Sequence, residues 1–259
     1  MVNLAANLSM MFNEVDFMGR FKQASNQKFK SVEYLFPYDF SKDDILNELN
    51  ENNLTQVLFD LPAGNWDSGD RGIAADPNRI TEFEDGVGLA LEFANVIKPI
   101  NLTCLVGKIP SGVSNIEAQD TLIKNLSFAA DKLSNSGFQL LVEPINTVDI
   151  PGYWLSRTDK SVEIINLVGH SNIKLQYDIY HMQIMEGNII NSIKNNLGII
   201  GHMQLADNPG RHEPGTGELN YSKIFNEIDS MGYEGWIGCE YIPAEDTISG
   251  LKWALPYLQ

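Results

Sequence analysis

The stretch that decides the fold runs from FQLLVE (138–143) through IKLQYD (173–178) and IIGHMQ (199–204) to WIGCE (236–240). Each of these short runs is rich in apolar residues. Each run ends in a residue whose side chain carries an oxygen that can bind a cation. In chain order these residues are Glu143, Asp178, Gln204 and Glu240. The four ends lie about one strand–helix repeat apart along the chain. Parallel strands need a crossover between them, so this spacing predicts successive βα units.

The same alternation extends over the whole chain of 259 residues. We expect strands at 3–8, 31–35, 56–59, 100–106, 139–142, 173–177, 199–205 and 236–239. Helical spacing of apolar residues marks 80–95, 116–133, 161–168 and 221–230. Eight such units predict an α/β fold, a single (β/α)8 TIM barrel, with one domain over 1–259. An open doubly wound sheet is the alternative, although no GxGxxG or GxxxxGK[ST] motif follows the first strand.

The composition favours a globular protein that handles small molecules. Hydrophobic residues make up 43% of the chain, which is enough for a large core. The net charge of −16 argues against nucleic acid and membrane as partners, because both are anionic. The two cysteines have no disulfide pattern, and no signal peptide or membrane-spanning run is visible, so we expect a cytoplasmic protein. A homo-oligomer is compatible with these features.

The four strand-end residues predict a cation site. In a barrel, Glu143, Asp178, Gln204 and Glu240 would converge on the face where active sites assemble. Three carboxylates and an amide oxygen suit Mg²⁺ or Mn²⁺ better than zinc, which prefers nitrogen and sulfur. Without a cation the carboxylates would repel one another and some would take up protons. The alternative is that each acid merely begins a polar loop.

Basic and polar side chains beyond the strands are candidates for binding substrate. His181 lies just past IKLQYD, on the loop side, where it can hydrogen-bond a ligand. Arg211, in the loop PGRHEPGTG with Glu213, can hold a carboxylate with two hydrogen bonds. A surface salt bridge within this loop is the alternative. Arg71 in GDRG and Lys108 in GKIP are weaker candidates of the same kind.

Other residues of these types are expected to be structural. His202 lies two positions before Gln204, so by strand alternation it points to the same side, and we expect a buried core histidine. His170 begins a surface turn, and Cys239 should point away from Glu240 and pack in the core. No GxSxG motif is present, which argues against an acyl-transfer hydrolase.

Two polar connections are longer than a turn requires. They span 61–78 and 206–220, and both follow predicted strands. Loops of this length in a compact domain are often functional. The first of them is a candidate lid over the site.

Several long segments resemble the hydroxypyruvate isomerase family of xylose-isomerase-like TIM barrels. They are EPINTVDIPGYWL from 143, LQYDIYHMQIMEGN from 175, GHMQLADNPGRHEPGTGELNY from 201 and GYEGWIGCEY from 232, with FPYDF, LPAGNWDSGDRGIAADP and GKIP in the N-terminal half. The resemblance covers essentially the whole chain, and PGRHEPGTGEL is long and specific. One departure is Lys28, where the family usually has glycine.

The resemblance implies an aldose–ketose isomerase that interconverts hydroxypyruvate and tartronate semialdehyde (2-hydroxy-3-oxopropanoate) through an enediolate, with help from a divalent cation. In families of this type, two glutamates at the ends of the fifth and eighth strands move protons and bind the metal. Those positions match Glu143 and Glu240. The remaining ligands match Asp178 and Gln204, and the glutamine favours this branch because many related sugar epimerases carry histidine there.

Three other functions are weighed against this one. A 2-oxo-tetronate isomerase, or a related ketose epimerase, has motifs too similar to separate. A phosphodiesterase of the endonuclease IV type needs a histidine-rich cluster and a basic groove, which four histidines and a charge of −16 disfavour. A non-catalytic sugar-binding barrel would be expected to lose one of the paired glutamates, and both are present.

Overall fold

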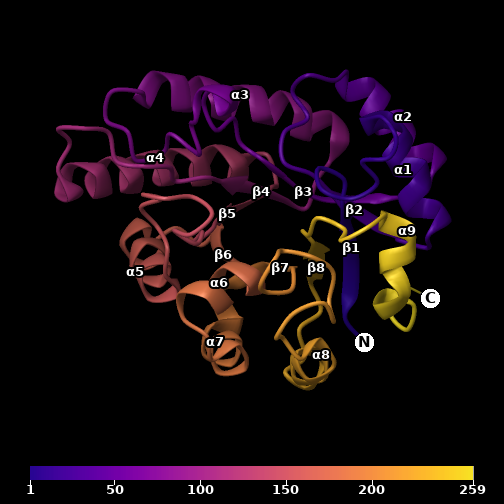
Figure 1. Ribbon diagram of the computed structural model, residues 1–259. Helices are drawn as coiled ribbons and strands as arrows, with labels where there is room; N and C mark the ends of the chain where they lie inside the picture. The colour runs from indigo at the N-terminus through magenta and orange to yellow at the C-terminus, as the bar shows by residue number, and fades with distance from the viewer. Residues whose placement is uncertain (259) are drawn as a thin grey trace.

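Eight parallel strands pair in chain order and close into a barrel, because β8 (Trp236–Cys239) pairs with β1 (Asn3–Asn7). The computed structural model describes residues 1–258, and Figure 1 shows the strands around the centre with helices outside them. The other strands are β2 (Ser31–Glu33), β3 (Thr55–Asp60), β4 (Asn101–Cys104), β5 (Gln139–Val142), β6 (Ile173–Asp178) and β7 (Ile200–Leu205). The predicted TIM barrel is confirmed, and the closing β1–β8 pairs exclude the open sheet.

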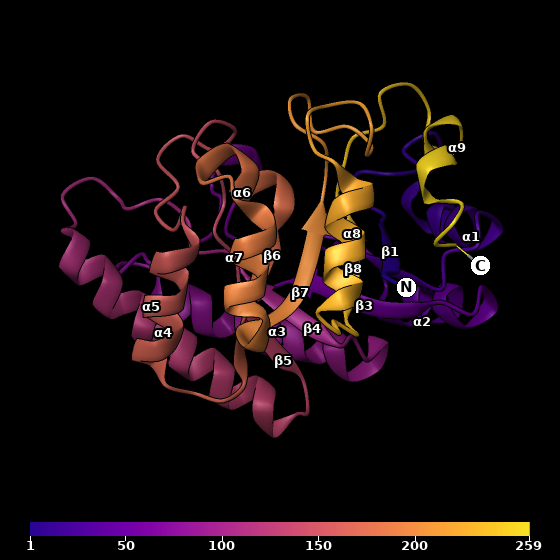
Figure 2. The same cartoon turned by 90° about the horizontal axis from the view of Figure 1, so that it is seen from below.

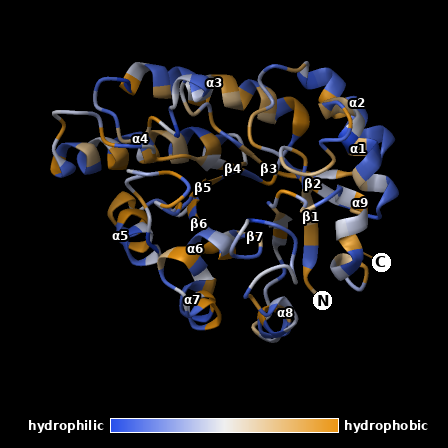
Figure 3. Cartoon of the chain, in the orientation of Figure 1, coloured by the Kyte–Doolittle hydropathy of each residue, from blue (hydrophilic) through white to orange (hydrophobic). Residues whose placement is uncertain are grey.

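Helices follow the strands and cover the outside of the barrel. They are α1 (Phe17–Asn26), α2 (Lys42–Glu51), α3 (Ile80–Ile97), α4 (Asn115–Asn135), α5 (Thr158–Val168), α6 (Ile179–Met185), α7 (Ile189–Asn196), α8 (Tyr221–Ser230) and α9 (Thr247–Gly250). Several helices begin with an N-cap residue. The hydroxyl of Ser41 accepts a hydrogen bond from the backbone N–H of Asp44, and that of Ser114 accepts one from Glu117. Orange and blue segments alternate along the helices in Figure 3, as expected when one face packs on the barrel and the other meets solvent.

Predicted and observed boundaries agree best where the apolar spacing is regular. The strands at 139–142 and 236–239 and the helix at 221–230 have the predicted ends, and the others shift by a few residues. β2 is shorter than expected because the N–H of Leu35 donates to Oγ of Ser9 instead of to a neighbouring strand. Helices α1, α2, α6 and α7 lie outside the four predicted helical segments; each is short, between 7 and 10 residues.

The long connection at 61–78 is tied down over its second half. Gly72 forms an antiparallel bridge with Val106 in the next βα connection, and the N–H of Ala75 donates to the carbonyl of Val106 at 3.2 Å. The two backbones approach so closely that a Cβ on Gly107 would lie 2.0 Å from the carbonyl oxygen of Gly72. Residues 71–77 are buried or half-buried, whereas most residues at 65–69 are exposed, and a lid role for this connection stays a prediction.

The ends of the strands that carry the long connections lie on one side of the barrel. Figure 2 shows the segments after β7 and β8 rising above this end.

Cys104 and Cys239 are both buried and free, which agrees with a packing role for Cys239. Among residues 1–258, no helix is both long enough and apolar enough to cross a membrane.

Candidate functional site

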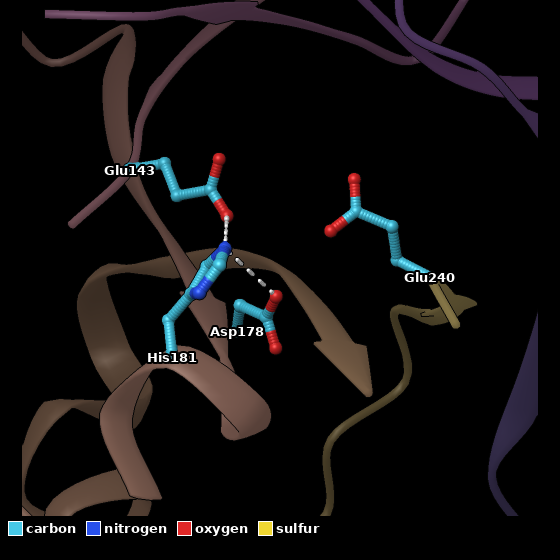
Figure 4. A group of neighbouring side chains, drawn as sticks. All are labelled: Glu143, Asp178, His181 and Glu240. Atoms are coloured by element: carbon cyan, nitrogen blue, oxygen red, sulfur yellow. Dashed lines mark ion pairs between the residues drawn. The ribbon is translucent and has the colours of Figure 1, made fainter. Parts of the chain in front are cut away.

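Three carboxylates and one histidine meet at the carboxyl ends of β5, β6 and β8. Glu143 directly follows β5, Asp178 is the last residue of β6, and Glu240 directly follows β8. His181 lies in the first turn of α6. All four side chains are buried, and one ligand atom from each lies within 4.8 Å of the others. In Figure 4 the two glutamates extend toward each other from opposite sides, with Asp178 and His181 between them.

These four residues are called the acid cluster below. Two of its carboxylate oxygens have no hydrogen-bond partner. Asp178 begins α6, and its Oδ1 accepts from the backbone N–H of Tyr180 at 2.8 Å. Its other oxygen, Oδ2, and Oε1 of Glu143 are buried and make no hydrogen bond within the described residues. Buried polar atoms normally have partners. The cluster therefore fits a divalent cation with hard oxygen ligands.

The tautomer of His181 is set by Asn146. Oδ1 of Asn146 accepts from two backbone N–H groups of its own loop, at 2.7 and 3.0 Å, so its amide nitrogen faces Nδ1 of His181 at 2.7 Å. Nδ1 is therefore the acceptor, and Nε2 carries the proton, 3.5 Å from Oδ2 of Asp178. Burial, reinforced by Arg211, lowers the pKa of His181 well below its usual value, so the ring is neutral. His181 thus offers the cluster a hydrogen-bond donor.

Burial raises the pKa of each acid in the cluster. It raises the pKa of Asp178 to about 6, against the opposing effect of Arg211. It raises the pKa of Glu240 to about 8, and Asp178 adds to this while Arg211 opposes it. The pKa of Glu143 lies well above its usual range, first through burial and then through the charges of Glu240 and Asp178. Carboxyl groups with pKa values near neutrality can accept and return protons at physiological pH.

Arg211 belongs to this site. Its Nη2 lies 2.5 Å from Oε2 of Glu240, and its guanidinium carbon lies 5.2 Å from the ring centroid of Tyr180. Burial acts to lower the pKa of Arg211, but Glu240 and the other acids outweigh it and raise the pKa. Because its partner is a buried acid outside its own loop, the alternative of a surface salt bridge within the loop is wrong.

The loop that carries Arg211 is built around Asp207, a residue that the sequence pattern does not single out. Oδ1 of Asp207 accepts from the backbone N–H groups of Asn208 and Leu219, at 2.9 and 3.0 Å, and Oδ2 accepts from Gly215 at 2.8 Å. Asp207 is fully buried. One carboxylate thus gathers both ends of the loop and fixes the position from which Arg211 reaches the cluster.

Glu213 is not part of the cluster. Its Oε2 accepts from the backbone N–H of Ala244 at 2.9 Å, which ties the loop to the segment after β8. The side chain therefore stabilises the loop and does not face Arg211. Its role in substrate binding stays a prediction.

Arg71 and Lys108 also lie away from the cluster. The guanidinium of Arg71 stacks on Trp66, 4.1 Å from the ring centroid, and donates to backbone carbonyls of its own loop. Lys108 is exposed, and its backbone bridges to Tyr153. Within residues 1–258 neither side chain forms an ion pair with the acids. The role of Arg71 and Lys108 in substrate binding stays a prediction.

Gln204 lies in register with Asp178 on the neighbouring strand, but its amide has partners in the barrel interior. Its Nε2 donates to Oε1 of Glu33 at 2.9 Å, and its Oε1 accepts from Gln176 at 2.6 Å. His202 is fully buried, as predicted, and its Nε2 lies 2.7 Å from Oε2 of Glu33. The interior below the acid cluster is thus polar and ordered by hydrogen bonds.

Two further buried acids, Asp60 and Glu33, are not among the predicted site residues. Asp60 ends β3 and has no partner for Oδ2; burial, then Glu240 and Glu33, raise its pKa well above the usual range. Glu33 ends β2 and is fully buried. The run VLFD ends in an acid in the same way as IKLQYD, so the signal that marks Asp178 also marks Asp60.

A cavity of about 730 Å³ opens next to Arg211 and Tyr180. Val148 and Ile242 line it from the connections after β5 and β8, and both are largely exposed. A cavity of this size is typical of small-molecule sites. Arg211 borders this cavity and also contacts Glu240 of the acid cluster.

The profile of the xylose isomerase-like TIM barrel family matches residues 21–257. The chain belongs to this family. It is 47% identical over 257 residues to the hydroxypyruvate isomerase of Escherichia coli K12, covering 99% of this chain and 100% of that relative. It is 45% identical over 258 residues to the 2-oxo-tetronate isomerase of Cupriavidus necator, covering 100% and 99%. These relatives confirm the prediction of an isomerase of this superfamily.

Two solved structures agree with the fold. A protein from Brucella melitensis described as an AP endonuclease, family 2, superposes with a TM-score of 0.97 at 45% identity, over 99% of both chains. The 3-keto-D-glucoside 4-epimerase of E. coli superposes with a TM-score of 0.81 at 18% identity, over 100% of this chain and 98% of that one. At that identity the second match supports the fold alone.

Proposed function

We propose that this protein interconverts hydroxypyruvate and tartronate semialdehyde with the help of a divalent cation. The observation that carries the proposal is the pair Glu143 and Glu240, which face each other across the cluster with pKa values raised above their usual range. The 47% identity to a hydroxypyruvate isomerase over nearly the whole chain supports the choice of substrate.

The cation, Mg²⁺ or Mn²⁺, would be held by Glu143, Asp178, Gln204 and Glu240. The unpartnered oxygens of Glu143 and Asp178 support this set. When bound, the cation would polarise the substrate carbonyl and offset the negative charge that develops beside it. His181 stands next to these ligands as a neutral donor and would hydrogen-bond a substrate oxygen.

The two glutamates would carry the protons. One carboxylate removes a proton from C3 of hydroxypyruvate, beside the carbonyl, and a carboxyl group on the opposite side delivers a proton to C2. The hydroxyl proton moves from O3 to O2, so the carbonyl passes from C2 to C3 and no redox partner is required. Burial of both side chains keeps bulk water from quenching the enediolate.

Arg211 would bind the substrate carboxylate. Its guanidinium borders the cavity beside the cluster and is charged because acids surround it. A guanidinium can hold a carboxylate with two parallel hydrogen bonds, which orients a short 2-oxo acid with its carbonyl toward the glutamates.

Interconversion of four-carbon 2-oxo-tetronates is the second candidate. The 45% identity to a 2-oxo-tetronate isomerase favours it almost equally, and the cavity has room for one more carbon. Purified protein supplied with Mn²⁺ is given each substrate in D2O, and product and deuterium incorporation at the carbon next to the carbonyl are followed by NMR. Turnover of hydroxypyruvate with deuterium exchange supports the proposal, and turnover of the tetronate alone would replace it with the second candidate.

Two other classes are less well supported. Phosphodiester cleavage, which the name of the Brucella protein suggests, calls for a histidine-rich cluster, whereas His181 is the one histidine in this cluster among residues 1–258. A non-catalytic barrel would show neither turnover nor deuterium exchange in the same experiment. A single domain over 1–259, a homo-oligomer and a cytoplasmic location stay predictions.

A further inference from the structure

A line of buried hydrogen bonds crosses the barrel interior below the acid cluster. Thr103 Oγ1 donates to Oε1 of Gln176 (2.5 Å), Gln176 Nε2 donates to Oε1 of Gln204 (2.6 Å), and Gln204 Nε2 donates to Oε1 of Glu33 (2.9 Å). All four side chains are at most 2% exposed. Because β2 and β7 are not neighbours in the sheet, the bond from Gln204 to Glu33 must pass through the interior.

Glu33 sets the direction in which hydrogen bonds are donated along this line. A threonine hydroxyl can donate or accept, and an amide can turn over, but a carboxylate can only accept. Asn7 also presents its amide nitrogen to Glu33 at 2.9 Å, and its own oxygen is held by the N–H of Ser9. Nε2 of His202 lies 2.7 Å from the other carboxylate oxygen. Side-chain nitrogens of Asn7, His202 and Gln204 thus face the carboxylate of Glu33. Of these three residues, Gln204 is the proposed cation ligand.

Space for this carboxylate is provided by Gly238. In the sheet Gly238 pairs with Gln204, and a Cβ at position 238 would lie 2.1 Å from Oε1 of Glu33. The carboxylate therefore occupies the volume that a side chain on β8 would fill. This absence of a side chain lets Glu33 reach from β2 to β7.

We propose that Glu33 is a positioning residue that orients the amide of Gln204. With its nitrogen held by Glu33, Gln204 keeps its oxygen on the side of β6, the strand that ends in Asp178. Gln176 occupies one lone pair of that oxygen and the second is free for a cation. This inference rests on the proposed function, in which Gln204 is a ligand. Outer partners of this kind fix the orientation of metal ligands and tune their affinity.

The test measures binding of Mn²⁺ to the purified, metal-free full chain. Glu33→Gln keeps the size of the side chain but can donate as well as accept, so the amide of Gln204 is no longer held in one orientation. We expect the Kd for Mn²⁺ to rise by about 10- to 100-fold. The matched control Thr103→Val removes the other end of the line and leaves the acceptor in place, and it should leave Kd within a few-fold. An unchanged Kd in Glu33→Gln overturns the proposal.

A double variant separates orientation from a merely structural role. In Glu33→Gln combined with Gln204→Glu, position 204 presents a carboxylate oxygen whichever way it turns, and the amide introduced at position 33 can donate to it. Recovery of Mn²⁺ affinity is expected. No recovery, with the same loss as in Glu33→Gln, assigns Glu33 a structural role only and overturns the proposal.

Two further variants complete the test. If circular dichroism shows that Glu33→Gln does not fold, Glu33→Asp replaces it, since a carboxylate one methylene shorter cannot keep the 2.9 Å contact, and an unchanged Kd then overturns the proposal. Gln204→Leu tests the ligand itself. Weaker binding in Gln204→Leu with unchanged binding in Glu33→Gln rejects the positioning role alone. Unchanged binding in Gln204→Leu removes Gln204 from the proposed ligands, and the positioning role falls with it.

Discussion

Arg211 and Glu240 come from connections after different strands, yet the guanidinium Nη2 lies 2.5 Å from the carboxylate Oε2. This contact joins the group proposed to bind the substrate carboxylate to a group proposed to move protons. A carboxylate that enters the site competes with Glu240 for the guanidinium. Arg211 lowers the pKa of Glu240, so loss of this contact raises that pKa and favours the protonated acid. Binding of a substrate carboxylate to Arg211, as proposed, would therefore be coupled to the proton state of Glu240.

Arg211→Lys should weaken substrate binding while the protein stays folded. Lysine keeps the positive charge but loses the two-pronged contact with a carboxylate. We expect KM for hydroxypyruvate to rise about tenfold or more, which corresponds to roughly 1.5–3 kcal/mol for a hydrogen bond to a charged group. Steady-state kinetics measure this, with the exposed Arg157→Lys as control. A KM equal to that of the wild type would remove Arg211 from substrate binding.

Glu143→Gln and Glu240→Gln should each abolish most of the isomerase activity. Glutamine has nearly the same shape but cannot carry the proton, so kcat should fall by about 10²- to 10⁴-fold. Circular dichroism should show an intact fold, and the surface variant Glu163→Gln should behave as the wild type. Near-normal turnover in both cluster variants would contradict the proposed mechanism.

The metal-free protein should lose stability as the pH rises from about 5 to 8. Folded Asp178 and Glu240, with pKa values of about 6 and about 8, keep protons that an unfolded carboxyl group has already released. The folded state therefore binds more protons in this window, and the free energy of unfolding falls with pH. Melting temperatures in EDTA measure the slope, and Glu240→Gln should flatten it. A melting temperature that is constant or rises over this range contradicts the assignment.

Added Mn²⁺ should stabilise the protein more at pH 8 than at pH 5. The cation binds deprotonated carboxylates, so protons and metal compete for the same oxygens. The measured quantity is the rise in melting temperature on adding Mn²⁺ at each pH. Equal rises at both values would indicate that the cation binds outside the acid cluster.

Replacing glycine by alanine is expected to change the stability of the protein in opposite directions at positions 238 and 88. Gly238→Ala should destabilise the protein by about 1–3 kcal/mol, because its methyl group would overlap the buried carboxylate of Glu33. Gly88→Ala, in the middle of α3 with open space around it, should stabilise the protein by about 0.5–1 kcal/mol. Urea unfolding of both variants measures the difference, and a stabilising effect of Gly238→Ala would show that the carboxylate does not occupy this space.

The barrel and the meeting of three acids follow from local patterns in the sequence. Short apolar runs separated by one repeat predict parallel strands, and residues at the ends of such strands share one face whatever the details of the helices. Glu143, Asp178 and Glu240 are therefore found together from spacing alone. Asp60, at the end of β3, carries the same signal.

Loop conformation and contacts across the interior do not follow from such patterns. Arg71 and Glu213 are polar residues in long loops, but turns and local partners direct them to Trp66 and to the backbone at Ala244. The contact of Glu33 with His202 joins residues 169 positions apart, on strands that are not paired. No spacing rule relates such residues, because their distance depends on how the barrel closes.

All four residues of the acid cluster come from the second half of the chain, between 143 and 240. The connections after β1 to β4 supply none of them, although they help to enclose the same end of the barrel. Substitutions in those connections can therefore change which molecules fit without altering the groups that transfer the proton. Enzymes built on this plan can exchange one substrate for another through changes in a few surface loops.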